Sequence, residues 1–232
     1  LKKSNKSKIW KFIFTKIIGI NLSDLIFPKI LLFKFKDFDF EIKNFYDYAK
    51  NNPQTKFMDN KNEVYQSNHD IEKKTEFKNL KKEIENFLNE KLKNKIFRKP
   101  TFGKFKLKSM WFVIMKKNST HDMHTHPKSA FTGVIYFKVN KNETSSALKV
   151  LIPNLNQNLY KMSHVNEEVL NKKTKLIDIN NIETELYDKK IFNFVPDNKD
   201  MIIFNSYMMH GIDKYVSNED RIALAWDAVY TI

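Results

Sequence analysis

Residues 131–139 read FTGVIYFKV, a run of β-branched and aromatic residues that favours a buried β-strand. Polar turns separate five more runs of this kind that follow Pro100: Met110–Met115, Ala147–Ile152, Ile191–Val195, Met201–Phe204 and Ile222–Tyr230. No long helical pattern lies between these runs. Such a series of short strands predicts an antiparallel sandwich or barrel.

The chain before Pro100 has a different pattern. Apolar residues recur every three or four positions between Thr75 and Leu92, which predicts an amphipathic helix. Ile30–Phe35 is expected to form a short strand. Residues 51–74 are rich in Asn and Lys and are expected to form a loop.

These patterns predict a mainly β fold with N-terminal helices. Residues 1–26 form a basic extension, and residues 27–232 form a single domain. Within that domain, residues 27–100 provide helical support and residues 101–232 the β core. A polar, weakly periodic insertion at residues 153–190 interrupts the core and has the character of a lid.

Composition excludes several classes of protein. The 232 residues include no cysteine, which excludes disulfide scaffolds, thiolate zinc sites, iron–sulfur centres and cysteine nucleophiles. The four glycines form no Gly-rich phosphate loop. Charged residues interrupt the apolar stretch from Ile9 to Phe35, so we expect no transmembrane segment and a cytoplasmic protein.

The positive charge lies almost entirely in the first half of the chain. Residues 1–108 hold 26 of the 41 basic residues but only 13 of the 27 acidic ones. Only Arg98 and Arg221 are arginine, the residue on which base-edge readout depends most. We therefore expect no sequence-specific binding of nucleic acid, and at most a weak contact of this basic half with anionic surfaces.

Three of the six histidines fall within residues 121–126. Residues two apart on an extended chain face the same side, so Asp122, His124 and His126 are expected to share a face. Two imidazoles at this spacing can hold a metal ion from one side. His210 follows a predicted strand and precedes Gly211, where a backbone or ligand can approach closely.

Arg221 opens the last predicted strand. An arginine inside a β core requires an anionic partner, either an internal carboxylate or the carboxylate of a ligand. Alternation places Arg221 on the same face as Ala223 and Ala225. By contrast, we expect Trp111 and Tyr136 in the core.

The order of these motifs resembles the iron(II)- and 2-oxoglutarate-dependent oxygenases, and more narrowly the family of 2OG-Fe(II) oxygenases. The matching landmarks are Gln66-Ser67-Asn68, Trp111, residues 124–127, 132–137 and 203–210, and Glu219–Ile222. The resemblance implies a double-stranded β-helix core of the jelly-roll or cupin-like type. It also implies Fe(2+) bound by His124, His126 and His210, and 2-oxoglutarate bound by Arg221. The substrate that such an enzyme would hydroxylate, a small molecule or a side chain, is not identified.

The sequence departs from that family's pattern at three places, one of which is Phe204-Asn205-Ser206 where the narrower family has Phe-Pro-Ser. Most iron/2-oxoglutarate enzymes use two histidines and one carboxylate. In this chain the second residue of the pair His124 and His126 is a histidine where those enzymes have a carboxylate. Two ligand sets therefore stay open: three histidines, or a set that includes Asp122 or His121. The resemblance also implies a residue with a small hydroxyl side chain at position 223. This chain has Ala223 there, so one hydrogen bond to 2-oxoglutarate would be missing.

Two other functions stay open at this point. The three histidines also fit a cupin-like metal dioxygenase that does not use 2-oxoglutarate. The basic first half of the chain fits a non-catalytic binding module with a basic face.

Overall fold

The computed structural model describes residues 29–35, 48, 51, 55–56, 64–97, 102–140, 147–152, 176–177 and 191–232. The predicted extension at residues 1–26 lies outside the described residues, and so does most of the predicted insertion at 153–190. Among the residues described, no helix has the length and apolar character needed to cross a membrane.

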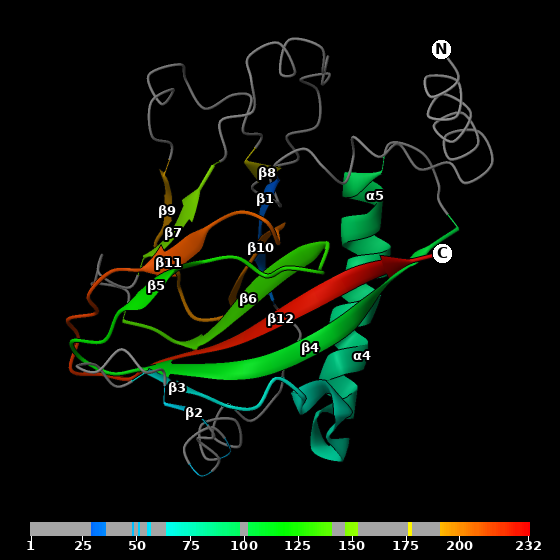
Figure 1. Ribbon diagram of the computed structural model, residues 1–232. Coiled ribbons are helices and arrows are strands. Elements are labelled where there is room, and N and C mark those ends of the chain that lie inside the picture. The colour runs from blue at the N-terminus through cyan, green and yellow to red at the C-terminus, as the bar shows by residue number, and fades with distance from the viewer. Residues whose placement is uncertain are drawn as a thin grey trace, which may run out of the picture.

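Two antiparallel sheets form the β core (Figure 1). The larger sheet has the strand order β2-β3-β4-β12-β6-β10-β1-β8. Its strands are β1 (Ile30–Lys34), β2 (Thr55–Lys56), β3 (Val64–Gln66), β4 (Lys104–Met115), β6 (Phe131–Lys138), β8 (Leu176–Ile177), β10 (Asp200–Asn205) and β12 (Arg221–Thr231). The smaller sheet has the order β5-β11-β7-β9, with β5 (His121–His124), β7 (Leu148–Leu151), β9 (Ile191–Phe194) and β11 (His210–Ile212). The prediction of a mainly β fold is confirmed.

The structure corrects the predicted loop at residues 51–74. Val64–Gln66 forms β3 and pairs with the end of β4, and Val64 and Gln66 are buried. These three residues are too few to give a periodic signal, and their extended form comes from pairing with β4. The short strands β5 and β11 were also not predicted, since neither contains a run of β-branched or aromatic residues.

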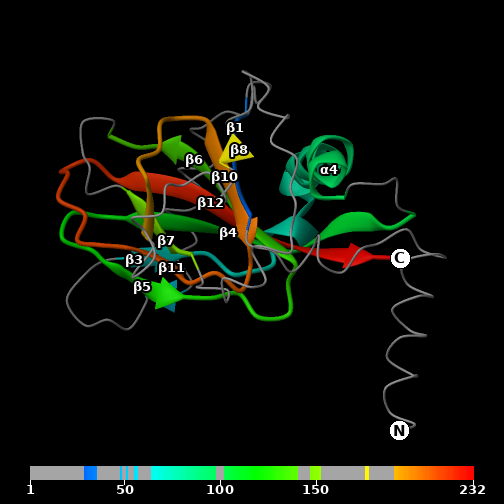
Figure 2. The same cartoon turned by 90° about the horizontal axis from the view of Figure 1, so that it is seen from above.

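The predicted helix at Thr75–Leu92 is present as a series of helical segments. A 3-10 turn at Ile71–Lys73 precedes a second at Thr75–Phe77, and the chain continues through α4 (Lys78–Phe87), a π-helical turn (Leu88–Leu92) and α5 (Lys93–Ile96). The apolar side of this series is at most 3% exposed: Phe77, Leu80, Ile84, Leu88, Leu92 and Ile96. It packs against one face of the larger sheet, as Figure 2 shows with α4 seen end-on.

Side chains of the helical segments also bind the backbone of β4. The side chain of Asn89 accepts a hydrogen bond from Phe105 N (2.8 Å) and donates one to Phe105 O (2.9 Å). Leu107 N donates to the carboxylate of Glu85, and Met110 N to that of Glu72. These side chains satisfy backbone groups at an edge of β4 that would otherwise need a strand partner.

The two faces of the larger sheet pack in two separate cores. Alternation along β12 places Ile222, Leu224 and Trp226 in the core that the helical segments cover. Ala223 and Ala225 belong to the second core, which lies between the two sheets. The candidate site lies on this second side, next to the smaller sheet.

Substituting Asn89→Ala is expected to reduce the free energy of unfolding by about 1–3 kcal/mol, because it leaves the N–H and C=O of Phe105 without their partner. Asn86→Ala is the matched control, since Asn86 is exposed on the same helix. It should change stability by less than about 0.5 kcal/mol. Chemical denaturation measures both values, and equal losses would show that the Asn89 contacts do not stabilise β4.

Candidate functional site

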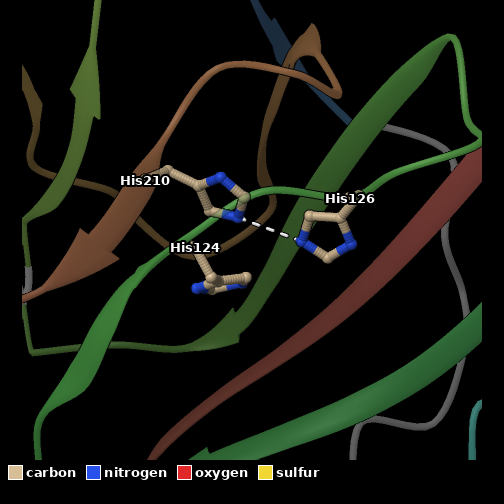
Figure 3. Close-up of side chains that lie close together, drawn as sticks. All are labelled: His124, His126 and His210. Carbon is tan, nitrogen blue, oxygen red and sulfur yellow. Dashed lines mark hydrogen bonds between the residues drawn. The ribbon is translucent and has the colours of Figure 1, made fainter.

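Three histidines, from two adjacent strands and the loop that follows one of them, converge at one point (Figure 3). His124 ends β5, His126 follows in the next loop, and His210 begins β11. One side-chain nitrogen from each lies within 4.8 Å of the others, and the Nε2 atoms of His126 and His210 are 3.2 Å apart. We call these residues the histidine cluster. The structure thus brings together the three predicted ligands.

Strand pairing produces this convergence. His210 lies directly opposite His124 in the pairing of β11 with β5, and the register shifts between His210 and Ile212. A Cβ atom at Gly211 would lie 2.6 Å from the carbonyl oxygen of His121 and 3.0 Å from the sulfur of Met123. Glycine is therefore required for β5 to approach β11 closely enough to bring the imidazoles together.

Each imidazole is oriented through its Nδ1 atom. In His124, Nδ1 is 2.7 Å from the carbonyl oxygen of Asp122, and in His210 it is 3.0 Å from that of Met208. In His126, Nδ1 is 3.2 and 3.3 Å from the two carboxylate oxygens of Asp227. These partners only accept hydrogen bonds, so each Nδ1 carries the proton and donates it.

The Nε2 atoms consequently carry lone pairs. The 3.2 Å contact between His126 and His210, dashed in Figure 3, then joins two acceptors with no proton between them. A cation coordinated by these atoms would turn this repulsion into attraction. The donor set therefore fits a divalent transition metal, for which neutral imidazole is a common ligand.

Burial keeps His124 and His210 neutral. It lowers the pKa of His210 to about 2 and also lowers the pKa of His124, and the neighbouring histidines add to both effects. Neutral imidazole is the form that binds metal, so the environment favours coordination.

Two nearby residues do not join the cluster. Asp122 is exposed, and its contact with His124 is made by its backbone carbonyl. The ring of His121 lies 4.5 Å from that of His124, and burial lowers the pKa of His121 to about 3. Neither side chain belongs to the group of atoms within coordinating distance among the described residues.

Sequence reasoning missed the residues that hold His126 in place. The Asp227 carboxylate is buried and contacts Nδ1 of His126. Trp111 is buried as predicted, but its ring also stacks with those of His126 and His69, at centroid distances of 5.4 and 4.2 Å. One signal for Asp227 was available, because it is the only charged residue between Ile222 and Tyr230.

Arg221 is buried without an ionic partner among the described residues. It is 1% exposed, and its Nη1 contacts the sulfur of Met115 at 3.6 Å. Its guanidinium carbon lies 4.8 Å from the centre of the Tyr136 ring. Neither Nε nor Nη2 of Arg221 has a hydrogen-bond partner in the part of the chain that the structure describes, and the same holds for the hydroxyl of Tyr136.

The electrostatics of this pair fit a bound anion. Burial lowers the pKa of the Arg221 guanidinium and raises the pKa of Tyr136 to about 12. No carboxylate of the described residues forms an ion pair with Arg221. A buried guanidinium with free donors is costly unless an anion meets it, and a carboxylate matches its planar geometry.

Comparison with known proteins agrees with this geometry. A family model described as "Putative 2OG-Fe(II) oxygenase" matches residues 109–227, which include the histidine cluster and Arg221. A search of curated proteins finds no significant match.

Solved structures share the fold at low sequence identity. The non-heme alpha ketoglutarate dependent epimerase SnoN from nogalamycin biosynthesis has a TM-score of 0.53 and 9% identity, over 87% of this chain and 78% of that one. A prolyl-4-hydroxylase from Pseudomonas putida has a TM-score of 0.51 and 10% identity, covering 90% and 96%. HygX from Streptomyces hygroscopicus, solved with nickel, 2-oxoglutarate and hygromycin B, has a TM-score of 0.50 and 11% identity, covering 94% and 86%. These likenesses confirm the predicted jelly-roll core.

The lowered pKa of His210 predicts a pH-dependent stability. Between the folded pKa near 2 and the ordinary value of 6.5, the unfolded chain binds a proton that the folded chain does not. The contribution of neutral His210 is therefore complete above about pH 6.5 and is lost as the pH falls. In the presence of a chelator, the free energy of unfolding should fall less steeply between pH 6.5 and 5 in His210→Asn than in the wild type. The difference in slope should be up to about 1.4 kcal/mol per pH unit. Chemical denaturation that gives the same pH dependence of unfolding free energy for the wild type and His210→Asn would contradict this expectation.

Proposed function

We propose, on the premise that the chain belongs to the 2OG-Fe(II) oxygenase family, that it is an iron(II)- and 2-oxoglutarate-dependent oxygenase that hydroxylates its substrate. In this proposal the histidine cluster holds iron(II), and Arg221 holds the distal carboxylate of 2-oxoglutarate. The observation that carries the proposal is the pairing of two features within one matched region. These are three imidazoles with converging lone pairs and a buried guanidinium without an anionic partner among the described residues.

The histidine cluster suits iron(II) because its ligands approach from three side chains and leave the rest of the coordination sphere to cosubstrate and oxygen. When bound, iron and 2-oxoglutarate would supply the oxidation: one atom of dioxygen would enter succinate as 2-oxoglutarate loses carbon dioxide, and the other would convert a C–H bond of the substrate to C–OH. The chain's own residues orient the three imidazoles. The carbonyls of Asp122 and Met208 and the carboxylate of Asp227 keep the three lone pairs directed inward.

Arg221 and Tyr136 together suit a carboxylate. The guanidinium offers a planar pair of donors, and the Tyr136 hydroxyl adds a third donor from β6. Tyr136 lies opposite Ala223 in the pairing of β6 with β12. The strand that neighbours Ala223 therefore supplies a hydroxyl-bearing side chain, where Ala223 itself has none. Burial of both side chains excludes water and strengthens these contacts.

We also propose that residues 27–232 form one catalytic domain, with residues 1–26 as a basic extension. Support comes from the larger sheet, because β1 and β12 both belong to it. A division of the chain between them would break this sheet.

A second candidate function is a cupin-like dioxygenase without 2-oxoglutarate. The all-histidine ligand set favours it. Under that function, however, the buried guanidinium of Arg221 would have no anion to meet.

Replacing Arg221 tests the assignment of the cosubstrate. Arg221→Ala removes one partner of a buried charge pair, at a cost of about 2–5 kcal/mol. We expect 2-oxoglutarate binding to weaken by roughly 30-fold or more, since about 1.4 kcal/mol corresponds to tenfold. Calorimetry with Mn(II)-loaded protein measures this affinity. Mn(II) binding itself should persist, and Arg221→Lys should recover only part of the affinity because an ammonium lacks the planar fork.

Arg98→Ala is the matched control, because it changes the chain's other arginine outside the matched residues 109–227. It should leave 2-oxoglutarate affinity unchanged. Unchanged affinity in Arg221→Ala as well would refute the assignment and favour the cupin-like dioxygenase. An assay of succinate release with iron(II) and 2-oxoglutarate tests turnover directly.

A further inference from the structure

We propose that Asp227 is the positioning carboxylate of the metal centre, which orients His126 and supplies the negative charge that an all-histidine ligand set lacks. This inference rests on the proposed function and deepens it. It concerns a residue that does not touch the metal and acts through His126.

The Asp227 carboxylate is enclosed by donors. It is 6% exposed, and its Oδ1 accepts a hydrogen bond from the hydroxyl of Thr132 at 2.7 Å. Its Oδ2 accepts one from the hydroxyl of Ser109 at 3.3 Å. The Nδ1 atom of His126 lies 3.2 and 3.3 Å from the two oxygens. No lysine or arginine forms an ion pair with Asp227 in the described part of the chain; its ion pair is with His126, and His69 and His124 also lie within range of its charge.

The sheet holds this carboxylate rigidly. Asp227 lies opposite Ser109 on β4 and opposite Thr132 on β6, so the three residues form one row across neighbouring strands. The register of β12 against β4 shifts immediately after this row. The two hydroxyls thus fix the carboxylate from both sides, and the remaining direction is occupied by the His126 ring.

A purely structural role does not require a charge at this position. An asparagine could accept the Thr132 hydrogen bond with its carbonyl oxygen and donate from its NH2 group to the Ser109 hydroxyl oxygen, without the cost of burying an anion. The negative charge of Asp227 instead affects the tautomer of His126. Facing an amide NH2 group, the imidazole would favour its other tautomer, in which Nδ1 accepts and Nε2 carries the proton. That proton would block the lone pair directed at the metal.

The charge balance points the same way. Three neutral imidazoles contribute no negative charge to a divalent metal, whereas a carboxylate ligand would contribute one. Asp227 places one negative charge behind His126, where it increases the basicity of this ligand. The outer carboxylate therefore takes over part of the role of the absent inner one.

The test measures Co(II) affinity by calorimetry and the visible spectrum of the Co(II) complex, without oxygen or 2-oxoglutarate. Asp227→Asn should weaken Co(II) binding by about 10- to 100-fold, the usual effect of removing such a partner, and should change the spectrum. Asp200→Asn is the control for net charge, because Asp200 is a partly buried carboxylate that pairs with Lys34 on another strand. It should leave both measurements unchanged.

A double variant tests whether Co(II) affinity can be recovered. His126→Asp combined with Asp227→Asn moves the negative charge into the ligand position, with an amide available to donate to it. This double variant should bind Co(II) more tightly than either single variant, since His126→Asp alone places two carboxylates side by side. Nitrogen-15 NMR of the metal-free wild-type protein needs no variant and should show His126 protonated at Nδ1.

The outcomes separate this inference from the proposed function. Wild-type protein that binds Co(II) and 2-oxoglutarate, with unchanged affinity and spectrum in Asp227→Asn, would overturn the role of Asp227 alone. His126 protonated at Nε2 in the wild type would overturn it as well. Wild-type protein that binds no Co(II) would overturn the proposed function and this inference together.

Discussion

The close pairing of β5 with β11 is the constraint on which the candidate site depends. It places His124 opposite His210 and directs the chain so that His126 meets both. The pairing itself depends on Gly211, since any side chain there would collide with the backbone of β5. A short strand pair in the smaller sheet therefore brings His210 together with His124 and His126, from which it is distant in sequence.

The larger sheet provides the rigid support for this pair. One face of β12 packs against the helical segments through Ile222, Leu224 and Trp226. The other face carries Arg221 at the start of the strand and Asp227 near its middle, with two small alanines between them. The same strand thus supplies both the proposed carboxylate-binding group and the contact to His126. Packing of the helical layer on one side fixes both groups on the other.

Much of this arrangement could be predicted from the sequence. Period-two alternation places Arg221 with Ala223 and Ala225, and the spacing of His124 and His126 by itself indicates a metal site. The family and the β core followed from the order of the motifs, and both are confirmed. Other features depend on tertiary pairing and leave no local signal. β3, β5 and β11 are extended only because a neighbouring strand binds them, and Asp122 faces outward although alternation placed it beside His124. The partners of Asp227 come from two other strands, which a single-sequence pattern does not relate.

The most direct test of this account is a crystal structure grown without oxygen in the presence of iron(II) and 2-oxoglutarate. The account predicts one metal ion about 2.1 Å from the Nε2 atoms of His124, His126 and His210, at the usual distance of an imidazole ligand. It also predicts the distal carboxylate of 2-oxoglutarate between Arg221 and Tyr136. A metal held by a different set of side chains, or a 2-oxoglutarate carboxylate bound away from Arg221, would contradict it.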